Sequence, residues 1–345
     1  MGLTNFPNGA SSFGVPLLGG IGGIPFTGNY YFVDPVNGLD GNSGGSQGRA
    51  LKTLYQAHYL AKDGNNDVII LIGNGQSSGT ARLSLANAQA VDSTATVGTL
   101  KWTKNATHLV GVCAPNMYAK RARIAPPTGT YTQATFGSGN FVTVTGGGCF
   151  FSNFSLFNGF STGGVNQICW TDSGSRNAYI GVDFGGMGDA ASAADAGSRS
   201  LKIGLAGSGE NYFNHCTIGL DTVTRGAANA SIEFAGGTPR NVFEDCILPM
   251  DASASSPFFI LGTGADCIDR GNVFRRCLLI NDIKSGATTI TAAMSLTSAS
   301  PGGLIGFLAS AAVGATKLGD TNALANTYID MAVPATSGGL AINPA

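Results

Sequence analysis

Acidic side chains are the groups in this 345-residue chain that are best suited to acid–base chemistry. Hydrolysis of a glycosidic bond, for example, needs two carboxyl groups, about 5 to 5.5 Å apart for retention or about 6.5 to 9.5 Å apart for inversion. The candidates lie in the repetitive middle of the sequence: Asp183, Glu210, Asp221, Glu233 and Glu244. We expect structural roles for all of them, with Asp183 pointing outward and Glu244 paired with Arg275 one repeat later.

Other catalytic arrangements have weaker support. Elimination by a lyase would need a calcium-binding carboxylate cluster and a base, and Asp266 and Asp269 beside Arg270 are more typical of a turn. His215 is expected to form local hydrogen bonds, because no G-x-S-x-G motif surrounds it. The two tryptophans, Trp102 and Trp170, are too far apart in sequence to indicate an aromatic sugar-binding groove. We therefore predict no catalytic residue and no enzymatic activity.

Composition excludes several classes of partner. The net charge of −1 and the pI near 6.3 indicate neither a nucleic-acid partner nor a membrane partner. The seven cysteines form no CxxC pair and the chain has only three histidines, so we predict no metal site and no cofactor. The first fifteen residues contain no Lys or Arg, which argues against a secretory signal. Reduced, buried thiols are the expected state of the cysteines.

The N-terminus predicts an extended arm over residues 1–29. It carries no charge and repeats Phe, Pro, Gly and Leu, so it cannot bury its own apolar groups or form regular structure. We expect it to lie on another surface or subunit. The predicted partner-binding residues are Phe6, Pro7, Phe13, Pro16, Leu17, Leu18, Ile21, Ile24 and Phe26.

Residues 30–75 predict a capping module. An amphipathic helix is expected over residues 51–62, with Gly64 as its stop, followed by a buried strand at residues 68–72. The order V-D-x-x-N-G-x-D-G-N-S-G, then K-T-L, then D-V-I-I-L-I resembles the opening module of pectate-lyase-like β-helices in bacteriophage virion proteins. In that family the short helix caps the open end of the core. The resemblance implies a right-handed β-helix and a homotrimer.

A repeated unit carries the fold prediction for residues 76–284. Its clearest copies are NYFNHCTI, NVFEDCIL and NVFRRCLL, with weaker ones at NAYIGVDF and NTYIDMAV. An aromatic and an apolar residue three apart break the two-residue period of a strand, so a sharp bend must separate two strands. The bend needs a residue that tolerates a left-handed backbone. The expected bend residues are Gly111, Asn153, Gly181, His215, Asp245, Arg276 and Asp330.

Stacking of these copies about 4.8 Å apart predicts three columns of like residues. The columns are Phe213, Phe243 and Phe274; Cys216, Cys246 and Cys277; and Asn211, Asn241 and Asn272, with Asn177 and Asn326 extending the last. A period near 30 residues is typical of a solenoid. We therefore predict an all-β, right-handed parallel β-helix with one short N-terminal capping helix, and a C-terminal cap or oligomer-contact segment at residues 285–345.

Two functions follow as hypotheses. The first is a structural virion protein, assembled in the host cytoplasm, that decorates or cements a phage capsid by binding the major capsid protein or another shell protein through its arm. The alternative is a tailspike or tail-fibre protein that binds or cleaves host surface polysaccharide. A secreted bacterial lyase is a third and weaker option.

Overall fold

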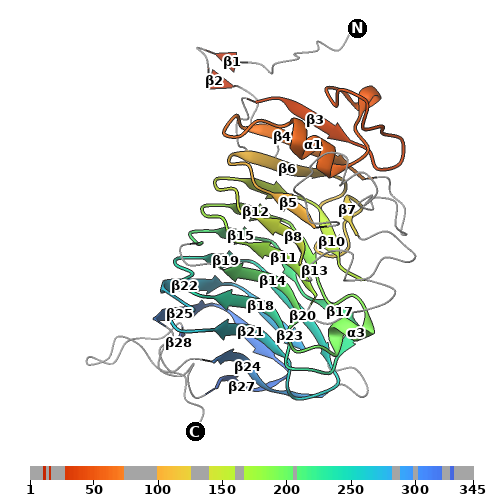
Figure 1. The fold of residues 1–345 in the computed structure, drawn as a ribbon. Helices are drawn as coiled ribbons and strands as arrows, with labels where there is room; N and C mark the ends of the chain where they lie inside the picture. The colour runs from red at the N-terminus through yellow and green to blue at the C-terminus, as the bar shows by residue number, and fades with distance from the viewer. Residues whose placement is uncertain are drawn as a thin grey trace.

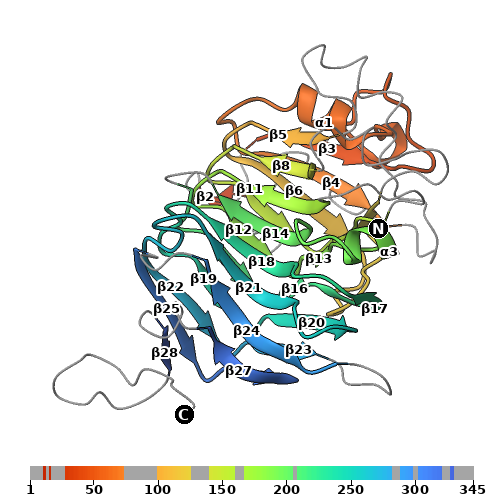
Figure 2. The ribbon, with the colours of Figure 1, turned by 60° about the horizontal axis from the view of Figure 1, so that its bottom comes forward.

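The structure is a computed structural model, and it describes residues 11–12, 15–16, 28–73, 99–125, 140–159, 167–204, 208–281, 288–297, 302–320 and 327–329. The chain winds into a right-handed parallel β-helix made of three parallel sheets (Figures 1 and 2). The predicted fold class is therefore confirmed. No helix in the described ranges is both long and apolar enough to cross a membrane.

From β6 onward the windings contribute strands to all three sheets in turn, and the three sheets enclose the core. Sheet 1 contains β3 (Tyr30–Val33), β4 (Asp67–Ile72), β6 (Thr107–Val112), β9 (Phe150–Ser152), β12 (Ala178–Ile180), β15 (Tyr212–Asn214), β19 (Val242–Glu244), β22 (Arg270–Arg275), β25 (Gly303–Leu308) and β28 (Thr327–Ile329). Sheet 2 contains β7 (Arg123–Ile124), β10 (Ser155–Phe157), β13 (Asp183–Gly185), β16 (Thr217–Ile218), β17 (Leu220–Arg225), β20 (Ile247–Ala252), β23 (Leu278–Asn281) and β26 (Ala311–Val313). Sheet 3 contains β5 (Leu100–Trp102), β8 (Asn140–Val144), β11 (Ile168–Asp172), β14 (Arg199–Gly204), β18 (Ala230–Ala235), β21 (Phe258–Thr263), β24 (Ile290–Leu296) and β27 (Ala315–Gly319).

The predicted capping helix is present but shorter than expected. Helix α1 spans Leu54–Leu60, because the Thr53 side chain accepts a hydrogen bond from the amide of Gln56 and fixes the start there. Leu51, predicted to be helical, instead forms a parallel bridge with Val33. Two further short helices, η1 (Gln47–Arg49) and α3 (Ala190–Ala193), were not predicted.

The bend between sheets 1 and 2 follows the predicted pattern in the central windings. Asn153, Gly181, His215, Asp245 and Arg276 all have a positive φ, between 51° and 60°. Arg276 therefore adopts the left-handed backbone although its residue type does not favour it. Ala309, with φ 49°, is the next bend residue and was missed. Asp330 lies outside the described residues.

Gly111 is a correction to that pattern. It lies within strand β6, without a positive φ, and is not a bend residue. A Cβ atom at Gly111 would come within 2.1 Å of the carbonyl oxygen of Asn153 in the next winding. Close approach of two windings, rather than a left-handed backbone, is what requires glycine there.

The aromatic and thiol columns lie in the core. The rings of Phe213, Phe243 and Phe274 stack with centroids 4.5 Å apart and interplanar angles of 4° and 5°. Tyr179 and Phe307 extend the column at 4.6 and 5.2 Å. All seven cysteines are free thiols and, apart from the half-buried Cys113, all are buried. The Sγ atoms of Cys216, Cys246 and Cys277 donate hydrogen bonds to backbone carbonyl oxygens of the preceding winding, those of Tyr179, Phe213 and Phe243, and burial raises the pKa of Cys246.

The asparagine ladder joins neighbouring windings at the corner between sheets 3 and 1. The Oδ1 atoms of Asn211, Asn241 and Asn272 accept hydrogen bonds from the backbone amides of Asn177, Asn211 and Asn241, at 2.9, 3.2 and 3.0 Å. Asn177 does the same for Cys149 at 2.8 Å. Each side chain thus satisfies a buried amide of the preceding winding. Asn326 lies outside the described residues.

The predicted arm is largely outside the described residues. Within it the structure describes residues 28–29 and the strands β1 (Ser11–Ser12) and β2 (Val15–Pro16), which pair antiparallel. The prediction that Phe6, Pro7, Phe13, Pro16, Leu17, Leu18, Ile21, Ile24 and Phe26 bind a partner therefore stays a prediction.

Candidate functional site

Residues 117–120 lie against sheet 2 and are held there by contacts with three windings. The Thr217 hydroxyl donates a hydrogen bond to the carbonyl oxygen of Met117. The Lys120 amide donates to Ser155 Oγ at 2.7 Å, and Lys120 Nζ lies 2.6 Å from Asp183 Oδ1. These contacts fix one wall of a depression on the sheet.

Asp183 is not a free carboxylate. Its side chain is 7% exposed and that of Lys120 is 1% exposed, so the two form a buried ion pair. Ser155 Oγ also donates a hydrogen bond to Asp183 Oδ2. Burial raises the pKa of Asp183, and the attraction of Lys120 opposes that rise. Asp183 points outward from sheet 2, as expected, but the segment at residues 117–120 covers it and supplies its ion-pair partner.

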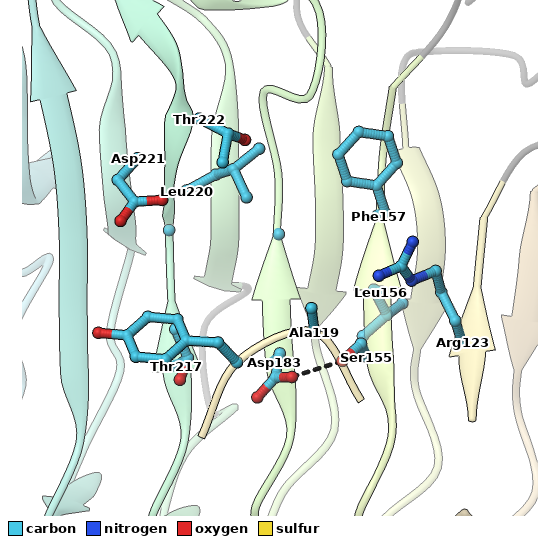
Figure 3. A pocket seen from close by; sticks show the side chains of 13 residues that line it. Ala119, Arg123, Ser155, Leu156, Phe157, Asp183, Thr217, Leu220, Asp221 and Thr222 are labelled. Carbon is cyan, nitrogen blue, oxygen red and sulfur yellow. Dashed lines mark hydrogen bonds between the residues drawn. The ribbon is translucent and has the colours of Figure 1, made fainter. Parts of the chain in front are cut away.

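A pocket of about 220 Å³ lies beside this segment (Figure 3). Strands β7, β10, β13, β16 and β17 supply most of its walls. The residues that line it are Tyr118, Ala119, Arg123, Ser155, Leu156, Phe157, Asp183, Gly185, Thr217, Gly219, Leu220, Asp221 and Thr222. It is thus a mixed apolar and polar depression on the outside of the solenoid.

Gly219 shapes the far wall of the pocket. Its φ of 128° breaks the chain between β16 and β17, and a Cβ atom there would lie 2.4 Å from the carbonyl oxygen of Pro249. After this break, β17 pairs with β20 in a register that shifts between Leu220 and Arg225. The shift displaces residues 220–222 from the regular ladder and places them along the pocket.

The lining suits a ligand that is partly apolar and rich in hydroxyl groups. Tyr118 is 47% exposed and Phe157 is half-buried, so both offer aromatic surface. Asp221 is half-buried and has no hydrogen-bond or ion-pair partner among the described residues. Thr222 is exposed. A sugar ring packs its C–H face on aromatic surface and exchanges hydrogen bonds with carboxylates and hydroxyls.

The remaining carboxylates lie outside the pocket and are held by basic residues. Glu210 contacts Arg176 at 2.8 Å and Arg240 at 2.5 Å, and both hydrogen bonds lower its pKa. Glu233, on sheet 3, contacts Arg199 at 2.7 Å and Lys202 at 3.3 Å. Burial raises the pKa of Glu233, but these two cations outweigh burial and leave it lowered.

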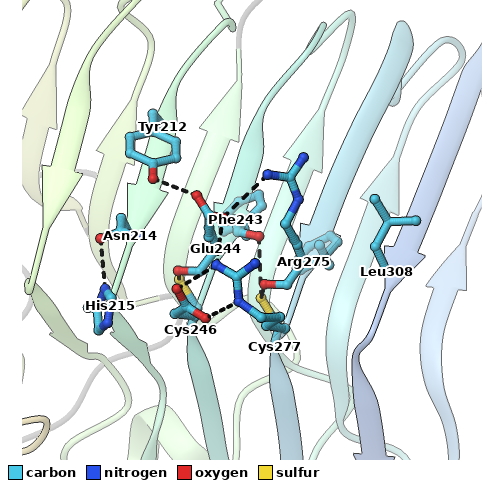
Figure 4. Close-up of polar contacts among 12 residues, drawn as sticks. Tyr212, Asn214, His215, Phe243, Glu244, Cys246, Arg275, Cys277 and Leu308 are labelled. Atoms are coloured by element: carbon cyan, nitrogen blue, oxygen red, sulfur yellow. Dashed lines mark hydrogen bonds and ion pairs between the residues drawn. The ribbon is translucent and has the colours of Figure 1, made fainter. Parts of the chain in front are cut away.

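Glu244, on sheet 1, forms the predicted pair with Arg275 at 3.3 Å (Figure 4). It also contacts Arg276 at 2.7 Å and accepts a hydrogen bond from the Tyr212 hydroxyl at 2.6 Å. These hydrogen bonds, that of Tyr212 foremost, lower the pKa of Glu244. Of the five candidate carboxylates, only Asp183 and Asp221 therefore share the pocket.

The other predicted residues have structural surroundings. Asp266 lies in a turn and Asp269 is 3.8 Å from Arg270. His215 Nδ1 lies 2.7 Å from Asn214 Oδ1, as expected of a local hydrogen bond. Trp102 and Trp170 are both fully buried in the core.

Sequence reasoning missed the aromatic wall of the pocket. Tyr118, Arg123 and Phe157 were not candidates, because the prediction considered only the two tryptophans as residues for sugar stacking. One signal was available: ten residues, 113–122, separate β6 from β7, whereas two residues separate β9 from β10. An insertion of that size at a corner that recurs in successive windings has to lie on the outside of the solenoid.

Comparisons with known proteins show which solved structures share this fold. No protein-family model matches the sequence, and no curated protein matches it. The chain is similar in structure to a mutant pectin methylesterase in complex with a hexasaccharide, at 14% identity over 90% of this chain and 92% of that one, with a TM-score of 0.50. It is also similar to the pectin methylesterase PemA from Erwinia chrysanthemi, at 12% identity over 90% of this chain and 92% of that one, with a TM-score of 0.46. A rhamnogalacturonan lyase matches at 11% identity over 82% of this chain and 74% of that one, with a TM-score of 0.42. At these identities the similarity establishes the β-helix fold alone.

Proposed function

We propose that this chain binds a polysaccharide on sheet 2, with one sugar unit in the pocket between residues 117–120 and 220–222. The observation that carries the proposal is the carboxylate of Asp221, which has no partner among the described residues and stands in one pocket with Phe157 and Tyr118. A parallel sheet also offers a straight outer face, along which a polymer can lie across several windings. The mutant pectin methylesterase shares this fold and was solved with a hexasaccharide, which agrees with such a use.

Binding rather than cleavage is the activity that the pocket supports. Its second carboxylate, Asp183, already has Lys120 and Ser155 as partners. General acid catalysis would require that carboxyl group to reach the substrate.

A glycan array that covers acidic and neutral polysaccharides tests the proposal. We expect wild-type protein to bind at least one class, and Phe157→Ala and Asp221→Asn to weaken that binding by at least tenfold. Tyr59→Ala is the matched control, because Tyr59 is 59% exposed on α1, away from sheet 2. Absence of binding across the array, or equal binding by wild type and both pocket variants, would contradict the proposal.

Capsid decoration remains a prediction from the sequence. It concerns the arm, a homotrimer and a location in the virion, and the described residues do not bear on these. Its measurement is stoichiometry against the major shell protein in purified particles: hundreds of copies would support it, and a dozen or fewer would contradict it.

A further inference from the structure

A second apolar cluster lies on the outer face of sheet 1, apart from the main core. It consists of Val68, Ile70, Val110 and Phe150, with Phe32 and Ile180 at its rim, and we call it the outer patch. These residues alternate along their strands with core residues such as Ile69 and Leu71. Because successive side chains of a strand point to opposite faces, the outer patch faces away from the solenoid interior.

The outer patch is nevertheless buried. Val68 is 1% exposed, Val110 0% and Phe150 2%. Among the described residues, those that pack with the patch belong to sheet 1 itself. Helix α1 contributes its buried side chains to the main core. Within the described ranges, no apolar residue from outside sheet 1 belongs to the patch, so its burial calls for a further covering segment.

Connectivity limits which part this is. Residues 74–98 run from β4 in sheet 1 to β5 in sheet 3, and residues 126–139, 160–166 and 282–287 run between sheets 2 and 3. Residues 205–207, 298–301 and 321–326 are short connections from sheet 3 that enter sheet 1 at β15, β25 and β28, beyond the patch. The C-terminal segment leaves from β28, at the far end of sheet 1. The N-terminal segment enters directly at β3, whose Tyr30 pairs with Val68 of the patch.

We propose that the N-terminal segment of residues 1–27 packs on the outer patch of its own chain. From β3 the patch extends over β4, β6, β9 and β12, about 19 Å at about 4.8 Å per strand, which about six extended residues can cross. Both surfaces are uncharged. Beyond β12 the column that contains Ile180 continues as Asn214, Glu244 and Arg275, so along this column the apolar surface ends where the ion pairs begin.

Photo-crosslinking in the full-length protein tests the placement. With p-benzoylphenylalanine in place of Phe13 or Phe26, we expect crosslinks to peptides that contain residues 68–71 or 108–112. A mixture of isotope-labelled and unlabelled protein should give crosslinks within one chain only. Crosslinks confined to other regions, or found between chains, would overturn the proposal.

Proteolysis of a patch variant provides a second test. Ile70→Asn should accelerate chymotryptic cleavage after Phe13 and Phe26 by at least tenfold, because a polar side chain weakens the apolar contact. Val273→Asn is the matched control, since Val273 lies on the same outer face but beyond the patch. An unchanged cleavage rate in a folded Ile70→Asn protein would contradict the proposal. If that variant does not fold, the crosslinking result alone tests the proposal.

Glycan binding at the pocket on sheet 2 is a separate measurement, so the two proposals can fail independently.

Discussion

Asp172 is an acidic side chain inside the solenoid. It is 0% exposed, and its carboxylate accepts hydrogen bonds from the Tyr179 hydroxyl at 2.7 Å and the Gly174 amide at 2.8 Å. No cation among the described residues forms an ion pair with it. Burial raises the pKa of Asp172 to about 6, and the hydrogen bonds only partly offset this. The native state therefore holds this proton more tightly than the unfolded chain does.

This raised pKa predicts a pH dependence of stability. The contribution of Asp172 is fully present below about pH 4 and is lost as the pH rises through about 6. Asp172→Asn removes it, so acidification from pH 7 to 4 should stabilise wild type relative to the variant by about 3 kcal/mol. Urea unfolding of both proteins at several pH values measures the difference between their free energies of unfolding. The contributions of the other carboxyl groups cancel in this difference. A difference that does not change with pH would contradict the assignment.

Residue identity alone did not reveal which acids are free. Glu244 was predicted correctly because its partner Arg275 occupies the aligned position one winding later. The ion pair of Asp183 was not predicted, because Lys120 is 63 residues away and belongs to no repeat. Met117 and Thr217, which help to form the pocket, are 100 residues apart. A sequence period near 30 residues predicts which residues are adjacent in successive windings. It carries no information about the contacts of an inserted segment, such as residues 117–120, that packs against several windings.

At the scale of the element, the bend between sheets 1 and 2 places one backbone conformation on very different residue types. Gly181 has φ 60° and Ala309 has φ 49° at equivalent positions. The left-handed conformation costs a residue with a Cβ atom about 1 to 2 kcal/mol. The fold tolerates this cost at non-glycine positions because the strands on both sides are held by their ladders.

Exchanging the residue types at these two bends should have opposite effects. Gly181→Ala should lower the free energy of unfolding by about 1 kcal/mol through the backbone alone, since the new Cβ meets Lys120 Cε at an ordinary 3.8 Å. Ala309→Gly should raise it by about 0.5 to 1 kcal/mol, because relief of strain exceeds the added entropy of the unfolded chain. Chemical denaturation measures both. Changes of the same sign in the two variants would rule out the bend as their cause.

The strands and columns were the most predictable elements. Phe, Cys and Asn recur at about the same spacing, and each type suits its position in the winding. The Phe rings stack, the Cys thiols fit a tight interior corner, and the Asn side chains form an amide ladder. Sequence reasoning failed at Gly111, where glycine is required by the close approach of the next winding and not by a left-handed backbone. It also failed at the start of α1, which is set by the capping hydrogen bond of Thr53. Both depend on atoms in another segment of the chain.

At the scale of the whole molecule, helix α1 caps the N-terminal end of the solenoid, and one lysine contacts the end of that helix. Lys104 Nζ donates hydrogen bonds to the carbonyl oxygens of His58 at 2.5 Å, Tyr59 at 2.8 Å and Ala61 at 2.5 Å. These are the carbonyls at the C-terminal end of α1, where a cation is favourable. The cap is thereby attached to the first winding.

Loss of this lysine should loosen the cap and leave the distant windings unchanged. In Lys104→Met, amide hydrogen exchange at residues 54–61 should accelerate by about tenfold, equivalent to about 1.4 kcal/mol. Exchange in β19 should not change, because each winding contacts only its neighbours. Lys101→Met serves as control, since Lys101 lies on the adjacent strand β5. Equal acceleration in β19 would show that the molecule opens as one unit instead.

The repeated hydrogen bonds between windings also have a genetic consequence. The amide contacts from Asn177 to Asn211, Asn241 and Asn272 repeat the same geometry at intervals of 34, 30 and 31 residues. A gene for such a chain can gain or lose a whole winding by tandem duplication or deletion, and every newly adjacent pair still fits. Evolution can thus adjust the length of the rod in steps of about 4.8 Å, provided that the windings gained or lost lie outside the pocket on sheet 2.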